Sequence, residues 1–98
     1  MSYRHIQLPE QGEKVRFGED GRPQVSDQPI LGYIEGDGIG PDITRACLRI
    51  WDAAVETVYG GRCKIHWCEL FLGEKAAGLY EGNYYPEETL AAIRELGV

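Results

Sequence analysis

Three glycines, Gly36, Gly38 and Gly40, have the residue type and spacing that most directly suggest binding chemistry in this sequence. They follow a short apolar run and precede a proline, so they fall between an expected strand and an expected helix. Glycine permits a positive φ and a close backbone approach, and the N–H groups at a helix start can bind an anion. Three interpretations follow: a phosphate cradle, a structural corner, or the signature of one enzyme family.

The dinucleotide-binding fingerprint G-x-G-x-x-G fits this turn poorly. Counted from Gly36, its third glycine would fall at position 41, which is a proline. The acid that binds ribose is expected about 20 residues after the turn, whereas Glu69, near the end of the next expected strand, lies much further along. Asp37 would also repel a pyrophosphate placed in the turn. On local grounds a structural corner is favoured over a phosphate cradle.

A second group of reactive side chains, Cys63, His66 and Cys68, has the residue types of a metal site. The stretch has the pattern of a strand, in which Cys63 and Cys68 would point to opposite faces. We therefore expect small apolar thiols on a strand and no metal ligands. An odd number of cysteines without framework-like spacing suits reduced thiols. His5, in an unpatterned N-terminal segment, receives no role.

The elements that must position the glycine turn follow from hydrophobic periodicity. Residues 30–34 and 63–72 are apolar runs that predict buried strands. Residues 1–29 carry repeated turn signals and predict an arm or hairpin outside the core, in which residues 14–17 pair with residues 24–26.

Two amphipathic helices are expected between and after these strands. The first has Gly40 as its cap and Pro41 in its first position, and it ends at Gly60. The second opens at Pro86 and ends before Gly97. The side chains expected to face inward are Ile43, Cys47, Ile50, Ala54 and Val58, flanked by Leu48, Trp51, Val55 and Tyr59, in the first helix and Leu90, Ile93 and Leu96 in the second.

The order strand, helix, strand, helix predicts an α/β protein with a mainly parallel sheet. Two core strands do not make a self-sufficient sheet, because both faces and both edges need cover. We therefore expect an arm or hairpin at residues 1–29, then the incomplete opening of a large α/β domain at residues 30–98.

Composition limits the class of partner. The chain has 98 residues, 43% hydrophobic and 27% charged, and a formal charge of −6 without any basic run. Nucleic acid and anionic membrane surfaces favour basic patches, so neither is an expected partner. No apolar run approaches the roughly 18 residues that span a bilayer, and the first residues lack the apolar stretch of a signal peptide. The expected compartment is the cytoplasm.

Residues 33–42, YIEGDGIGPD, resemble the N-terminal signature of the β-decarboxylating dehydrogenases, the family of isocitrate and isopropylmalate dehydrogenases. Similar blocks follow in the expected order: DAAVE at 52–56, KIHW at 64–67, GEK at 73–75, PEETL at 86–90 and IRE at 93–95. The similarity covers essentially the whole chain. It is greatest to the branch of bacterial NADP-dependent isocitrate dehydrogenases.

Two details favour this branch over the isopropylmalate dehydrogenases. Those enzymes generally begin almost directly at the first strand, whereas 29 residues precede Ile30 here, and they carry a proline where this chain has Glu35. The chain also departs from close relatives, since Gly32 stands where a proline is common and Pro41, Thr44 and Arg45 differ.

The resemblance implies an isopropylmalate dehydrogenase-like fold, with this chain as the N-terminal βαβα portion of the large domain. It implies a cytoplasmic homodimer that oxidises isocitrate with NADP⁺ and, with Mg²⁺ or Mn²⁺ acting as a Lewis acid, releases CO₂ to give 2-oxoglutarate. The residue matching the family's apolar contact to the adenosine of NADP is Ile39. The family's catalytic, substrate and metal residues are expected beyond Val98, so none is assigned to this chain.

Two other readings remain open. The parent protein could be an isopropylmalate dehydrogenase or a related 2-hydroxy-acid β-decarboxylating dehydrogenase, or the chain could be a truncated, non-catalytic interaction module that pairs through an exposed sheet edge. The 98-residue chain itself is expected to be inactive. Glu35 and Asp37 are expected to accept local hydrogen bonds from backbone N–H groups, and neither is expected to bind metal.

Overall fold

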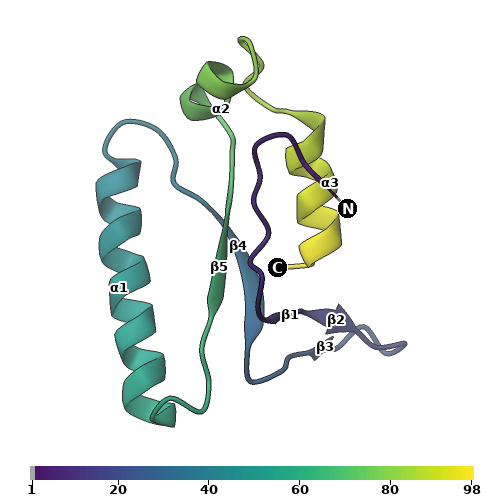
Figure 1. Ribbon diagram of the computed structural model, residues 1–98, viewed down its shortest axis with the longest axis vertical. Helices are drawn as coiled ribbons and strands as arrows, with labels where there is room; N and C mark the ends of the chain where they lie inside the picture. Colours follow the sequence, from purple (N-terminus) through teal and green to yellow (C-terminus); the bar gives the residue numbers. More distant parts are fainter. Residues whose placement is uncertain (1) are drawn as a thin grey trace.

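The computed structural model describes residues 2–98 and contains a parallel sheet with the strand order β1-β4-β5 (Figure 1). β4 (Pro29–Ile34) lies in the middle, β5 (His66–Leu70) pairs with one edge and β1 (Glu13–Lys14) with the other. In the longer pairing Ile30 lies opposite His66 and Ile34 opposite Leu70. The predicted parallel α/β arrangement is confirmed, although β5 is shorter than the run expected at residues 63–72.

The N-terminal segment forms a hairpin, as predicted, but it also contributes to the core. β2 (Arg16–Phe17) pairs antiparallel with β3 (Pro23–Gln24). The expectation that this segment stays outside the core was wrong, because Ile6 is 4% exposed and Val15 is 5% exposed. An edge and a face of β4 would otherwise be uncovered, and the N-terminal segment covers part of both.

α1 (Gly40–Tyr59) is the crossover from β4 to β5, and Figure 1 shows it on one side of the two strands with α3 on the other. The helix begins at Gly40, so its N-cap is Ile39, one residue before the expected cap. Gly60 ends the helix as predicted, with φ 59° and its N–H donating to the carbonyl of Glu56.

Much of the apolar arc of α1 stays in contact with solvent. Ile43, Ile50 and Val58, expected to face inward, are 54%, 65% and 71% exposed. Contact with the sheet is made instead around Trp51, whose ring stacks on that of Trp67 with centroids 5.8 Å apart. Three short strands offer too little surface to cover the whole apolar arc of a 20-residue helix.

Two further helices follow β5. α2 (Glu74–Leu79) is a short helix that periodicity did not predict, since six residues are too few to display a helical repeat. α3 (Glu87–Leu96) begins after Pro86 and ends at Gly97, as predicted. No helix within residues 2–98 has the length and hydropathy needed to cross a bilayer.

The face that α3 buries differs from the prediction. Leu96 is fully buried as expected, but Leu90 and Ile93 are 37% and 41% exposed. Thr89 is buried in their place, because its hydroxyl donates to the carbonyl of Phe71 at 2.7 Å. The core cluster comprises Ile6, Ile30, Cys68, Leu70, Ala92 and Leu96.

Candidate functional site

Residues 35–42, here called the glycine corner, link the end of β4 to the start of α1. β5 runs parallel to β4, so its carboxyl end lies beside the corner, and the chain then turns at Gly73 into α2. In open α/β sheets, ligands bind beyond the carboxyl ends of the strands. The glycine corner is therefore the part of this fold where a binding function is expected.

All three glycines of the corner meet a backbone requirement. Gly36 and Gly38 have φ values of 79° and 63°, in the left-handed region that other residues rarely adopt. At Gly40 the constraint is space, because a Cβ would lie 2.5 Å from the carbonyl oxygen of Glu35. The structural-corner interpretation is confirmed.

Three backbone N–H groups at the start of α1, those of Gly40, Asp42 and Ile43, donate within the corner and the first turn of the helix. Gly40 N–H donates to the carbonyl of Asp37 at 3.0 Å, and the N–H groups of Asp42 and Ile43 both donate to the carbonyl of Ile39. Pro41 has no N–H. These three donors are therefore not free to bind a pyrophosphate, and the absence of a phosphate cradle stays a prediction.

Asp37 joins the corner to the start of α2. Its two carboxylate oxygens lie 3.0 and 3.1 Å from the backbone nitrogen of Glu74, which donates to them. The preceding residue, Gly73, has φ 81°, and a Cβ there would overlap the Asp37 carboxylate. The prediction that Asp37 accepts a backbone hydrogen bond is confirmed, but the expectation that this bond is local was wrong, because the donor lies 37 residues further along the chain.

Glu35 behaves differently, because its partner is the side chain of Lys75. The Lys75 ammonium lies 2.6 Å from a carboxylate oxygen of Glu35 and 2.5 Å from one of Glu69. The hydrogen bond from Lys75 lowers the pKa of Glu35, and the hydrogen bonds to Glu35 and Glu69 raise the pKa of Lys75. The expectation of backbone bonding was therefore wrong for the Glu35 carboxylate.

Sequence reasoning missed Lys75 as part of this site. It lies in the GEK block that resembles the dehydrogenase family, but its partners come from the ends of two strands distant in sequence. Only the register of β4 with β5 brings Glu35 and Glu69 within reach of one ammonium group. No local spacing signals such a three-residue contact.

Ile39, the residue expected to contact adenosine, sits at the tip of the corner as the N-cap of α1. Ile39 is 68% exposed, comparable with Ile50 of α1 at 65%. The side chain is therefore accessible for an apolar contact.

The possible metal cluster is dispersed in the fold. Cys63 contacts Asp27, His66 shares a hydrogen bond with Gln28, and Cys68 is buried. Throughout residues 2–98, no three histidine, cysteine or acidic side chains come together in a way that could hold a metal ion.

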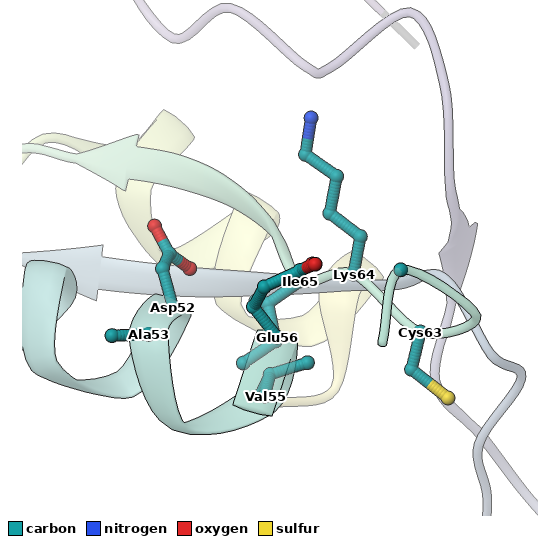
Figure 2. Close-up of a pocket in the computed structure, with 8 residues that line it drawn as sticks. Asp52, Ala53, Val55, Glu56, Cys63, Lys64 and Ile65 are labelled. Atoms are coloured by element: carbon teal, nitrogen blue, oxygen red, sulfur yellow. The ribbon is translucent and has the colours of Figure 1, made fainter. Parts of the chain in front are cut away.

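A hollow of about 470 Å³ lies between the C-terminal half of α1 and residues 61–65 (Figure 2). In Figure 2 the thiol of Cys63 points away from Asp52 and Glu56, and Lys64 extends in another direction. These polar groups do not converge on one point. The hollow is also remote from the glycine corner, which adjoins the other end of α1.

Comparison with known proteins gives one consistent result. No protein-family model matches the chain. Among curated proteins, the isocitrate dehydrogenase [NADP] of Coxiella burnetii is 46% identical over 99 residues, that of Pseudomonas aeruginosa is 44% identical over 96, and that of Archaeoglobus fulgidus is 45% identical over 98. These matches cover 97 to 100% of the chain but only 23% of each relative. They confirm the resemblance found in the sequence.

Proposed function

We propose that this chain, related along its whole length to the NADP-dependent isocitrate dehydrogenases, is a segment of an enzyme that oxidises isocitrate with NADP⁺ and releases CO₂ to form 2-oxoglutarate. The observation that carries the proposal is 43 to 46% identity to isocitrate dehydrogenases over nearly all 98 residues. The parallel pair β4 and β5 with α1 as crossover supports an isopropylmalate dehydrogenase-like fold. We assign residues 1–29 to an N-terminal arm and 30–98 to the start of the large domain.

Within that enzyme, the chain's part is to present Ile39 to the adenosine portion of NADP. The exposed Ile39 side chain supports an apolar contact there. When bound, NADP⁺ supplies the hydride acceptor and Mg²⁺ or Mn²⁺ the Lewis acid for decarboxylation. We assign none of the metal ligands to this chain.

Substitution of Ile39 tests the proposed cofactor contact. Ile39→Ser in the intact protein should raise the KM for NADP⁺ about tenfold, the equivalent of losing roughly 1.4 kcal/mol of apolar contact, with kcat nearly unchanged. The matched control is Ile43→Ser, which removes another exposed isoleucine one turn further along α1. An unchanged KM for NADP⁺ in the Ile39 variant would remove this residue from the cofactor site.

Activity measurements test the reaction itself. The intact protein should form NADPH when given isocitrate, NADP⁺ and Mg²⁺ or Mn²⁺, whereas the 98-residue chain should form none. Activity of the 98-residue chain would show that catalytic residues lie within it. Turnover of isopropylmalate in preference to isocitrate by the intact protein would instead favour the related dehydrogenase.

The proposed assembly is a homodimer in the cytoplasm. Sedimentation of the intact protein would test whether it is a dimer.

A non-catalytic interaction module remains the alternative of another class. It predicts that the intact protein lacks dehydrogenase activity and captures a partner through the free edge of β5.

A further inference from the structure

The contacts around Lys75 tie together three segments that are separate in sequence. Glu35 follows β4, Glu69 lies near the end of β5, and Lys75 is in the first turn of α2. The Lys75 ammonium contacts both carboxylates, at 2.6 and 2.5 Å. Asp37 adds a second link, since its carboxylate accepts the N–H of Glu74.

The two carboxylates that meet Lys75 are more protected than the lysine itself. The side chains of Glu35 and Glu69 are 16% and 26% exposed, against 42% for Lys75. Partly buried like charges repel more strongly than charges in water. Removal of the ammonium would therefore leave two acids facing each other at the ends of paired strands, in addition to the loss of an ion pair.

We propose that Lys75 is a positioning residue that, together with Asp37, holds the glycine corner against the start of α2 and so fixes the direction in which Ile39 is presented. Lys75 acts on the corner through Glu35, whose backbone carbonyl also accepts the hydroxyl of Thr44 in α1 at 3.1 Å. The consequence for NADP binding rests on the proposed function, whereas the effect on the corner does not.

The test uses Lys75→Gln in the intact protein, with hydrogen exchange of a peptide covering residues 33–43 and the Kd for NADP⁺ as two separate readouts. Exchange of this peptide should accelerate about fivefold or more, and the Kd for NADP⁺ and its KM should rise by about fivefold with kcat retained. The conservative Lys75→Arg variant should restore both readouts. The matched control is Lys64→Gln, which removes an exposed lysine outside the cluster.

A second variant separates positioning from general loss of stability. If repulsion between Glu35 and Glu69 loosens the corner, Glu69→Gln added to Lys75→Gln should slow the exchange again and recover part of the NADP⁺ affinity. Failure of the second substitution to do either would overturn the proposed role of the two acids.

The two readouts distinguish failure of this inference from failure of the proposed function. Unchanged exchange at residues 33–43 in Lys75→Gln would overturn the positioning role. Faster exchange with an unchanged Kd for NADP⁺ would uphold it and would overturn the assignment of the corner to the cofactor site.

Discussion

At the scale of single residues, the absence of a side chain at Gly73 lets α2 approach the glycine corner. Gly73→Ala should destabilise the protein by about 1–3 kcal/mol, because the φ of 81° strains alanine and its Cβ would overlap the Asp37 carboxylate. Urea unfolding would measure the loss of free energy of unfolding.

Gly78, which lies within α2, provides the matched control for Gly73, which caps the start of that helix. A Cβ at Gly78 meets no atom within 4 Å, so Gly78→Ala should leave stability unchanged or raise it by up to about 1 kcal/mol. Equal unfolding midpoints for the two alanine variants would contradict the close-approach argument.

At the scale of elements, α3 is held by the side chain at its C-terminal end. Leu96 is 0% exposed and belongs to the core cluster, so Leu96→Ala should cost about 2–5 kcal/mol. Leu90→Ala, at a position 37% exposed, should cost under about 1 kcal/mol. Comparable losses of unfolding free energy in the two variants would show that α3 packs through another face.

The N-terminal arm is attached to α3 through Glu88. The backbone N–H groups of Arg4 and His5 donate to its carboxylate at 2.8 and 3.1 Å, and the hydroxyl of Tyr80 also donates to it. Burial acts to raise the pKa of Glu88, but these hydrogen bonds outweigh it and lower the pKa overall.

This lowered pKa predicts acid release of the arm. Because the folded pKa of Glu88 lies below the ordinary value of 4.5, its stabilising contribution is present above that value and is lost as pH falls through the lower, folded pKa. The amide NMR signals of Arg4 and His5 should shift over that range. In Glu88→Gln these shifts should disappear, and signals that still titrated in the variant would refute the attachment.

At the scale of the whole molecule, α1 presents an exposed apolar side to solvent. Ile43, Ile50 and Val58 form an exposed apolar stripe, and large patches of this kind promote association. The 98-residue chain should therefore self-associate as its concentration rises. Ile50→Lys combined with Val58→Lys should reduce the association seen by sedimentation.

Val25→Lys is the control for the variant of the stripe. Val25 is 58% exposed but directly follows β3 and is not part of the α1 stripe, so its substitution should leave association unchanged. A chain that stays monomeric at every concentration would show that the stripe does not drive contacts between copies.

The sequence alone determined the features that depend on local physics. The apolar run of β4, Pro41, Gly60 and Gly97 defined a strand and the limits of two helices, because backbone preferences act within a few residues. The mismatch with the dinucleotide fingerprint likewise predicted a corner instead of a phosphate cradle. The proposed chemical function rests on the resemblance and on the relatives.

Only the tertiary structure decided which surfaces meet. Periodicity identified α1 and α3 as amphipathic but did not reveal that α1 leaves Ile50 open or that α3 buries Thr89. Nor did it place Ile6 in the core or join Lys75 to Glu35 and Glu69. Burial and ion pairing depend on neighbours that strand register and helix docking bring from distant positions, and no local spacing records them.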